Sequence, residues 1–314
     1  MELFDGHCDT LTRCLREGTR LGRNPGNIDL ERGRGLGRWA QFFALFHEPD
    51  VIPSGGASPE TVFEVGCRFF QQELEANAEQ IVQCRTGAEI QAALDSGKCA
   101  ALLSVEGAEL LGCSLEGLER AWQQGVRAVG LTWNHANALS GSIAQEPERG
   151  LSPQGRAFVE RMGELGMLVD VSHLSDPGFW EVAELVKGPF VATHSNARSL
   201  CPQMRNLTDD MFRAIAHKKG AVGINLFRGF VGEPATLDQV VAHIEHFLAL
   251  GGEETVCIGG DLDGCGDCLP DGISGIQDFT LLYEALLRRN YTETLVHAIF
   301  FDNLMRVVNE VCTM

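Results

Sequence analysis

Eight short apolar runs recur along the chain, and longer amphipathic stretches separate them. The runs cover residues 2–9, 39–46, 100–107, 127–134, 167–173, 190–195, 221–227 and 256–264. Most of them are continuously apolar and do not alternate with polar positions, which is typical of parallel strands buried on both faces of a sheet. The pattern therefore predicts eight parallel strands.

Helix signals fill the stretches between these runs. Amphipathic or capped stretches cover residues 58–84, 152–166, 175–186, 207–220 and 236–252. Ser152 precedes a first-turn proline, and Ser175 and Thr208 precede acidic residues, so all three are predicted N-cap residues. Residues 15–38 are rich in glycine and arginine and are predicted to form a loop after the first strand.

Strand and helix alternate eight times, which is the rhythm of a (β/α)8 barrel. A doubly wound open sheet is the competing α/β fold, and the count of eight favours the barrel. No linker rich in proline, glycine or serine interrupts the chain. We therefore expect residues 1–314 to form a single (β/α)8 TIM-barrel domain.

Polar residues stand at the ends of the predicted strands. They are His7, Asp9, Glu106, Asn134, His135, His173, His194, Asp261 and Asp263. The carboxyl ends of all strands meet at one face of a barrel, so we expect these side chains to converge there. Residues two apart in a strand face the same way, so His7 and Asp9 can both point into the barrel.

Three imidazoles and two carboxylates from this group form a ligand set suited to divalent zinc. They are His7, Asp9, Glu106, His173 and His194. Each of them alone has a structural explanation, because a histidine is more often simply hydrogen-bonded and Glu106 could cap the next helix. The placement of all five at predicted strand ends favours a metal site.

The remaining histidines are not assigned to this site. Four of them fall inside predicted helices and are expected to have no catalytic role: His217, His243, His246 and His297. His47 ends the second predicted strand and is a weaker candidate for lining the mouth of the barrel.

Composition and charge narrow the classes of function. The chain is 44% hydrophobic and 22% charged, as globular proteins are, and its formal net charge of -18 argues against a nucleic-acid partner. The sequence shows no signal-peptide pattern, membrane-length apolar stretch or lipid-anchor signal, which predicts a cytoplasmic protein without a membrane role. The 11 cysteines are an odd number, with CGDC (265–268) as the one CxxC pair, and are predicted to stay reduced.

Seven fragments carry a resemblance to a known family. They are DGHCDT (5–10), SVEGAE (104–109), LTWNHAN (131–137), RGLSPQGRAFVERMGELGMLVDVSH (149–173), PFVATHSNARSL (189–200), RNLTDDMFRAI (205–215) and IGGDLDG (258–264). In these fragments the sequence resembles the membrane dipeptidase (renal dipeptidase) family of zinc peptidases, and its soluble microbial members most of all. The combination of MLVDVSH, THSNAR and RNLTDD is specific, and the fragments span most of the chain.

The resemblance implies a (β/α)8 barrel of the metal-dependent amidohydrolase type that holds two zinc ions. By motif, His7 and Asp9 would bind one zinc ion, His173 and His194 would bind the other, and Glu106 would bridge both.

The resemblance also implies roles in substrate binding and proton transfer. His135 would contact the substrate and help to polarise the scissile carbonyl, and Arg205 would hold a substrate carboxylate. The alternative for Arg205 is an ion pair with an aspartate at the start of the next helix. Asp261 would act as the acid and base, with Asp263 as the fallback.

Three positions depart from the family pattern. Cys8 stands where asparagine is common, Leu262 replaces an aromatic residue, and residues 106–109 read EGAE instead of EGGH. A sulfur at Cys8 would add sensitivity to oxidation if it lay near the metals. None of these departures removes a predicted ligand.

Together these features predict a zinc-dependent dipeptidase that hydrolyses the peptide bond of dipeptides through a metal-bridging hydroxide and tolerates a D-residue at the carboxyl side. Hydrolysis of a lactam, a lactone or an N-acyl amino acid on the same site is one alternative. A binding protein that has lost catalysis is the other, and retention of all five ligands and Asp261 argues against it. Family members often form homodimers, so the resemblance implies a homodimer here.

Overall fold

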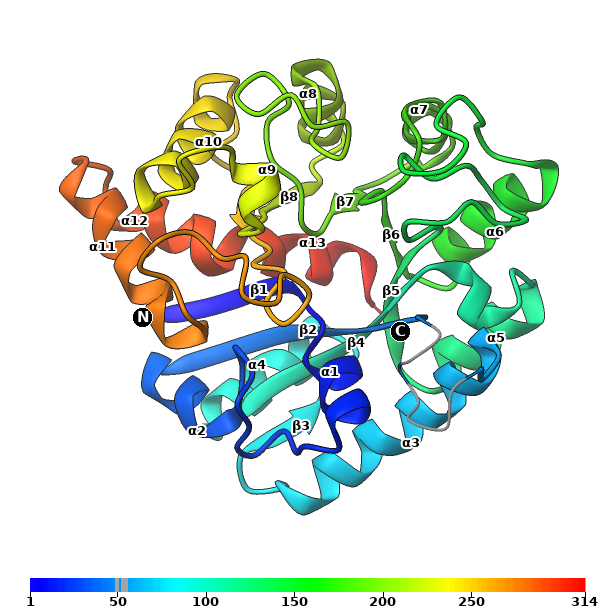
Figure 1. The fold of residues 1–314 in the computed structure, drawn as a ribbon, viewed down its shortest axis with the longest axis horizontal. Helices are drawn as coiled ribbons and strands as arrows, with labels where there is room; N and C mark the ends of the chain where they lie inside the picture. Colours follow the sequence, from blue (N-terminus) through cyan, green and yellow to red (C-terminus); the bar gives the residue numbers. More distant parts are fainter. Residues whose placement is uncertain (49–50, 52–55, 314) are drawn as a thin grey trace.

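The computed structural model of this chain describes residues 1–48, 51 and 56–313. A parallel barrel lies at its centre (Figure 1). The barrel strands are β1 (Glu2–Cys8), β2 (Arg38–Phe46), β4 (Cys99–Glu106), β5 (Val126–Gly130), β6 (Leu168–Asp170), β7 (Val191–Ala192), β8 (Ala221–Ile224) and β9 (Val256–Ile258). Neighbouring strands pair in parallel around the ring, and the β1–β9 and β2–β4 pairings close it. The predicted (β/α)8 barrel is confirmed, and the open doubly wound sheet is excluded.

A further strand, β3 (Ile81–Gln83), lies outside this ring. It pairs in parallel with residues 99–101 at the start of β4, and β5 pairs with the same side of β4 from Leu103 onward. The predicted helix over 58–84 is therefore too long, because α3 (Pro59–Ala76) ends before β3 begins. Asn77 ends α3 with a non-helical backbone, and its side-chain amide donates to the Glu73 carbonyl at 2.9 Å.

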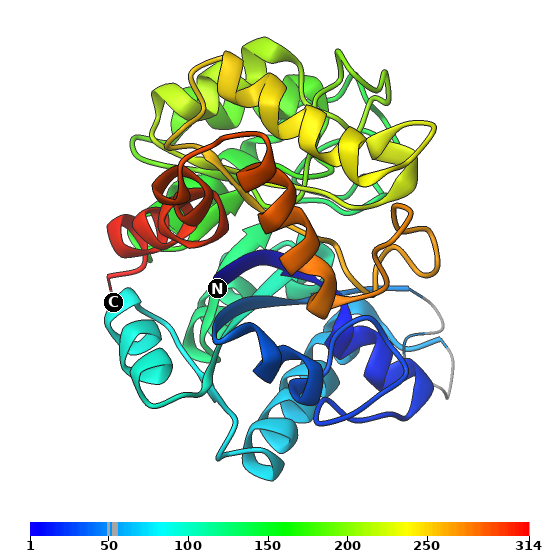
Figure 2. The same cartoon turned by 90° about the vertical axis from the view of Figure 1, so that its left-hand side faces the viewer.

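Helices cover the outside of the barrel (Figures 1 and 2). Besides α3 they are α1 (Thr10–Glu17), α2 (Leu30–Gly33), η1 (Arg34–Leu36), α4 (Gly87–Asp95), η2 (Ala108–Leu111), α5 (Leu115–Gln123), α6 (Pro153–Glu164), α7 (Asp176–Leu185), α8 (Asp209–His217), α9 (Arg228–Val231), α10 (Leu237–Ala249), η3 (Ile276–Asp278), α11 (Phe279–Arg288), α12 (Glu293–His297), η4 (Ala298–Asp302) and α13 (Asn303–Val311). Residues 15–38 are thus not one loop, because they contain the end of α1, all of α2 and η1.

The predicted N-caps are confirmed. The side-chain oxygens of Ser152, Ser175 and Thr208 each accept a hydrogen bond from the backbone N–H three residues later, at 3.0, 3.1 and 3.2 Å. Each bond satisfies one of the backbone donors that a helix start leaves without an intrahelical partner. These caps fix where α6, α7 and α8 begin on the barrel wall.

Helical segments close the amino-terminal end of the barrel. Phe4 stacks on Phe42 inside the ring at 5.8 Å between ring centroids, and both belong to one buried cluster with Phe301 of η4 and Leu304 and Val307 of α13. Figure 2 shows these helices on the side where both termini lie. The opposite face, where the strands end, is therefore the one open to solvent.

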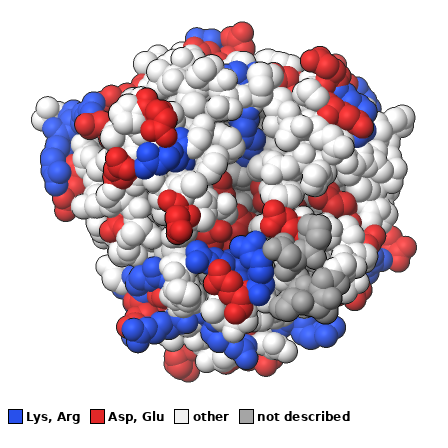
Figure 3. Space-filling model, viewed as in Figure 1, with Lys and Arg blue, Asp and Glu red and all other residues white. Residues whose placement is uncertain are grey.

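The open face carries the loops that follow the strands (Figure 2). Figure 3 looks onto this face and shows acidic side chains around its middle, with a mixed group of basic and acidic side chains directly below them. Within the described ranges, no helix combines the length and the apolar character needed to cross a bilayer.

Candidate metal centre

The five predicted ligands converge where the strands end. His7 lies near the end of β1, Asp9 follows it, Glu106 is the last residue of β4, and His173 and His194 lie just after β6 and β7. All five side chains are buried, at 1–8% exposure for the residues. Parallel strands in a closed ring bring these distant parts of the chain to one place.

The Glu106 carboxylate faces two groups of ligand atoms. Its Oε1 lies 2.9 Å from His173 Nε2 and 3.3 Å from His194 Nε2. Its Oε2 lies 3.6 Å from His7 Nε2, which is itself 3.5 Å from Asp9 Oδ2. One carboxylate thus has a pair of imidazoles on one side and an imidazole with a carboxylate on the other.

These residues fit a bound cation. His7 Nε2, Asp9 Oδ1 and Glu106 Oε1 are buried and lack a hydrogen-bond partner. Three overlapping groups bring potential ligand atoms within 4.8 Å of one another: His7 with Asp9 and Glu106, Glu106 with His173 and His194, and His7 with His194 and Asp261. Because buried polar atoms are nearly always paired, unpaired nitrogen and oxygen atoms that face each other point to metal coordination.

Burial sets the charge states of the imidazoles. It lowers the pKa of His173 and of His194 well below the usual value, and the nearby charges of Arg205 and His7 act in the same direction. Both rings are therefore neutral at pH 7, which is the form that binds metals. Burial also lowers the pKa of His7, but Glu106 and Asp9 outweigh it and raise that pKa to about 10.

The carboxylates experience the opposite effect. Burial raises the pKa of Glu106 well above its usual value and raises the pKa of Asp261 to about 7, with the charge of Asp9 adding to both shifts. Crowded, buried carboxylates that prefer to be neutral are stabilised as anions by a cation among them. The electrostatics therefore agree with the unpaired atoms in favouring bound metal.

Two hydrogen-bond networks orient the imidazoles. His194 Nδ1 donates to Thr193 Oγ1 at 2.8 Å, and that hydroxyl donates to Asp170 Oδ2. Asp170 Oδ1 is held by the backbone N–H groups of Ser172 and Thr193, both at 3.0 Å. The network assigns the ring proton of His194 to Nδ1 and leaves the Nε2 lone pair directed at the cluster.

His173 has an equivalent support. Its Nδ1 lies 3.0 Å from Asn134 Oδ1, so Nδ1 donates and Nε2 is again free to bind. The backbone of His173 has a φ of 67°, and that of Asp261 has a φ of 56°. Few residues other than glycine adopt this left-handed region, and such positions are common where a loop aims a functional side chain.

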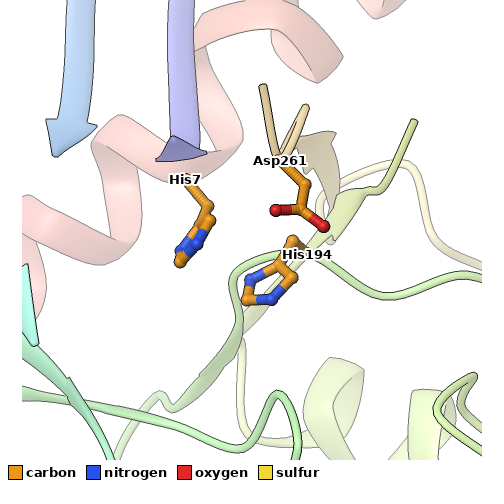
Figure 4. Close-up of side chains that lie close together, drawn as sticks. All are labelled: His7, His194 and Asp261. Carbon is orange, nitrogen blue, oxygen red and sulfur yellow. The ribbon is translucent and has the colours of Figure 1, made fainter. Parts of the chain in front are cut away.

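Asp261 and Asp263 have different surroundings. Figure 4 shows the Asp261 side chain directed toward the same space as His7 and His194, and its Oδ2 accepts from Asn225 Nδ2 at 2.9 Å. The Asp263 carboxylate accepts from the Thr10 hydroxyl, a guanidinium nitrogen of Arg13 and the Asn27 backbone N–H, at 2.5, 3.0 and 2.6 Å. Of the two aspartates, Asp261 is the one that lies in the metal cluster.

Asp5 supports the backbone before Asp261. This fully buried carboxyl accepts from the Gly260 N–H at 2.8 Å and from the Gln41 amide at 3.0 Å. Burial raises the pKa of Asp5 to about 6. The contact joins β1 to the segment between β9 and Asp261.

Arg205 lies beside the cluster and makes no pair with the aspartates of α8. Its guanidinium donates to Ser195 Oγ at 2.8 Å and to the His194 carbonyl at 3.1 Å, and it lies 5.6 Å above the ring centroid of Phe230. The α8 aspartates pair elsewhere, with His246 and Arg213. The Nε of Arg205 is buried and unpaired, and burial lowers the pKa of the group.

His135 lies farther out than the other predicted residues. It is exposed, and its ring contacts Trp133 at a centroid distance of 5.9 Å. His47 follows β2, and its Nε2 lies 3.3 Å from the Ala57 carbonyl. The Cys8 side chain belongs to the buried hydrophobic core outside the metal cluster.

Sequence reasoning missed the supporting residues. Asp170 was the one acid in the apolar run 167–173, and a buried charge in such a run is a usable signal. Thr193 and Asn225 gave no such signal, because a hydroxyl or an amide beside a strand end is common. Their roles follow only from their hydrogen bonds.

A model of the family described as membrane dipeptidase (peptidase family M19) matches residues 1–314. Two bacterial proteins are similar in sequence. An uncharacterised protein in the pqqA 5′ region of Klebsiella pneumoniae is 31% identical over 255 residues, with 77% of this chain and 93% of that protein covered. An uncharacterised protein in the PQQ-III 3′ region of Acinetobacter calcoaceticus is 30% identical over 284 residues, with 78% of this chain and 89% of that protein covered.

Two solved structures are similar over nearly their whole length. A metallopeptidase from Rhodobacter sphaeroides, bound to a phosphinate mimic of the dipeptide L-Ala-D-Ala, has a TM-score of 0.90 and 28% identity, with 99% of both chains covered. The dipeptidase AC, a metallopeptidase of family M19, has a TM-score of 0.90 and 29% identity, with 100% of this chain and 99% of that chain covered. The match across all 314 residues, with the clustered ligand side chains, shows that this chain belongs to the membrane dipeptidase family, peptidase family M19, and is a metal-dependent dipeptidase.

Proposed function

We propose that this chain hydrolyses dipeptides with two zinc ions per chain and that residues 1–314 form one catalytic domain. The observation that carries this is the position of Glu106 between two sets of ligand atoms. His7 and Asp9 would hold one ion, His173 and His194 would hold the other, and Glu106 would be shared. Imidazole and carboxylate ligands suit zinc. When bound, the ions would lower the pKa of water and polarise the scissile carbonyl.

Asp261 carries protons in this proposal. Its carboxylate lies beside His7 and His194, and Asn225 fixes its orientation through a hydrogen bond of 2.9 Å. A carboxyl whose pKa is raised toward 7 can take a proton from water and give it to the leaving amine near neutral pH. A peptide amine is a poor leaving group, so this delivery is needed. His135, at the rim, would stabilise the oxygen on which negative charge develops.

Arg205 binds the free carboxylate of the substrate in this proposal. A buried guanidinium with an unpaired Nε, next to the ligand His194, offers a rigid fork that matches a carboxylate. Because the carboxylate docks there, a longer peptide would have no room for its continuing chain. The fork contacts the carboxylate and not the side chain, so a D-residue at the carboxyl side would be tolerated. The similar Rhodobacter sphaeroides enzyme was solved with a mimic of L-Ala-D-Ala, which supports this substrate class.

A comparison of acid and amide substrates tests the proposal. Zinc-loaded protein should hydrolyse a dipeptide faster than its carboxyamide by a factor equivalent to about 2–3 kcal/mol, the scale of a charge-assisted hydrogen-bond pair. Arg205→Ala should lose this preference, and Arg205→Lys should keep part of it because it retains the charge without the fork.

Equal rates for acid and amide in the wild type would contradict the role of Arg205. A lactone, a lactam and an N-acyl amino acid belong in the same panel, because faster hydrolysis of one of them than of any dipeptide would favour the alternative amidohydrolase chemistry.

A further inference from the structure

The wall of the mouth opposite Arg205 contains a carboxylate that the proposed mechanism does not use. Arg205 follows β7, and the ring order places β2 four strands away, directly opposite, with β1 and β4 as its neighbours and β5 beyond β4. Glu109 follows β4 in η2. A dipeptide whose carboxylate is held at Arg205 and whose carbonyl is at the cluster would extend its amino-terminal residue toward this wall.

The position of Glu109 depends on Gly107. A Cβ atom at residue 107 would lie 2.3 Å from Glu109 Oε1, and the φ of Gly107 is +99°. Glycine therefore lets the Glu109 carboxylate rest against the backbone of the residue that follows Glu106. Asn137 then fixes it, because the amide donates to Glu109 Oε2 at 2.9 Å and to the Leu131 carbonyl at 2.7 Å.

Glu109 is a partly accessible carboxyl group. Burial raises its pKa, and the hydrogen bond from Asn137 and the charges of His47 and His135 only partly offset that rise. The side chain is partly exposed, whereas Glu106 is buried. Asn137, which holds the Glu109 carboxylate, lies two residues after the rim residue His135.

Aromatic rings line the same wall. Phe46 ends β2 and contacts Trp133, which follows β5, at a centroid distance of 5.1 Å, and Trp133 contacts His135. Trp133 is partly exposed. A carboxylate and aromatic faces on one wall can each attract a lysine or arginine side chain, the carboxylate through an ion pair and the rings through cation–π contact.

We propose that Glu109 is a specificity-determining residue that selects dipeptides with a lysine or arginine at the amino-terminal position. The proposal rests on the dipeptidase function above. The α-ammonium group, which every free dipeptide carries, sits one carbon from the scissile carbonyl and stays near the cluster. Glu109 lies in η2, three residues after the ligand Glu106, and a long side chain of the substrate would be needed to reach it.

The test measures kcat/KM for Arg-Ala and Met-Ala, whose first residues are both long and unbranched but differ in charge. Wild-type protein should prefer Arg-Ala by ~10–100-fold, the range of a hydrogen bond to a charged group that is partly shielded from water. Glu109→Gln should bring the ratio close to one, and Glu109→Asp should keep part of the preference. Glu116→Gln is the matched control, because Glu116 lies exposed on α5 with Arg120 as its partner, and it should keep the wild-type ratio.

The outcomes separate this proposal from the dipeptidase function. Hydrolysis of both peptides at equal rates by the wild type would overturn the role of Glu109 and leave the dipeptidase intact, whereas hydrolysis of neither would contradict the dipeptidase itself. If a folded Glu109→Gln protein loses kcat/KM for Arg-Ala and for Met-Ala by the same factor, the proposal is also overturned. Glu109 would then not distinguish the charged from the uncharged substrate side chain. If Glu109→Gln does not fold, the wild-type preference must still shrink as ionic strength rises, and a preference that is independent of salt contradicts the proposal.

Discussion

Two aspartates in the loop after β9 lie two residues apart and have different partners. The Asp263 carboxylate is held by Thr10, Arg13 and Asn27 and fastens this loop to α1 and to the segment that follows it. The Asp261 carboxylate lies with His7 and His194. At the residue scale the two carboxyls should therefore fail in different ways when they are replaced.

We expect Asp261→Asn to lower kcat by ~100-fold or more with its metal content unchanged, because an amide cannot carry the proton. Asp263→Asn should lose far less turnover but melt at a lower temperature, since the amide no longer balances the Arg13 charge. Elemental analysis, steady-state kinetics and thermal melts check both. An Asp263→Asn protein that is fully stable and nearly inactive would reverse the assignment.

The hydroxyl of Thr193 carries the contact between Asp170 and His194. Thr193→Val keeps the shape of the side chain but removes this link, so the His194 ring loses its fixed tautomer. Apparent zinc affinity, measured by competition with a chelator in the absence of substrate, should fall by ~10–100-fold. Thr193→Ser retains the hydroxyl and is the matched control. Wild-type affinity in Thr193→Val would show that Asp170 and Thr193 do not support a ligand.

The candidate ligands were predictable from the sequence for a physical reason. Polar residues at the ends of continuously apolar strands, such as His7 and Glu106, stand out, and barrel closure brings strand ends together. The choice between Asp261 and Asp263 came from the family motif, because both follow the same predicted strand. Thr193 could not be found, since its role depends on a hydrogen bond to Asp170 across two strands.

At the scale of elements, the strands were predicted correctly because both faces of each barrel strand are buried, and this burial makes the strand sequences continuously apolar. All eight barrel strands fall on the predicted apolar runs. The error over 58–84 arose because Ile81 and Val82 continue the apolar pattern of α3 past its true end, where Asn77 stops the helix and β3 begins. Helix α2 in the glycine-rich segment was missed because it has four residues and no amphipathic repeat.

Asp29 caps α2 and controls the pH dependence of this short element. Its Oδ1 accepts from the Arg32 N–H at 2.8 Å, and its Oδ2 accepts from Arg32 Nε at 3.0 Å. Burial raises the pKa of Asp29, but these bonds outweigh it and lower the pKa. A carboxyl with a lowered folded-state pKa stabilises the fold above its unfolded pKa of ~4 and loses that contribution as pH falls through the folded value.

Asp29→Asn keeps a capping side chain but removes the charge, so it should lower the free energy of unfolding by about 1–2 kcal/mol at pH 7. The difference from wild type should shrink as pH falls below ~4 and vanish once the pH is below the lowered folded-state pKa. Urea unfolding of both proteins across this range measures it, and loss of metal at low pH affects the two equally. A difference that is independent of pH would contradict a role for the charge.

At the scale of the whole molecule, closure of the barrel at one end leaves a single face for chemistry. The α13 and η4 helices fill the end where the strands begin, and the ligands, Arg205 and Glu109 all lie near or after strand ends. The net charge of -18 is compatible with a cationic substrate residue and opposes nucleic-acid binding. The cytoplasmic location and the homodimer stay predictions of the sequence and its family resemblance.

A zinc titration of metal-free protein tests the central claim most directly. The rate of dipeptide hydrolysis is measured as zinc is added in known ratio to the chain. We expect no hydrolysis without metal and a rise that reaches its plateau at two zinc ions per chain, because the ligand atoms around Glu106 divide into two sets. Full activity in metal-free protein, or a plateau at one ion per chain, would contradict the account.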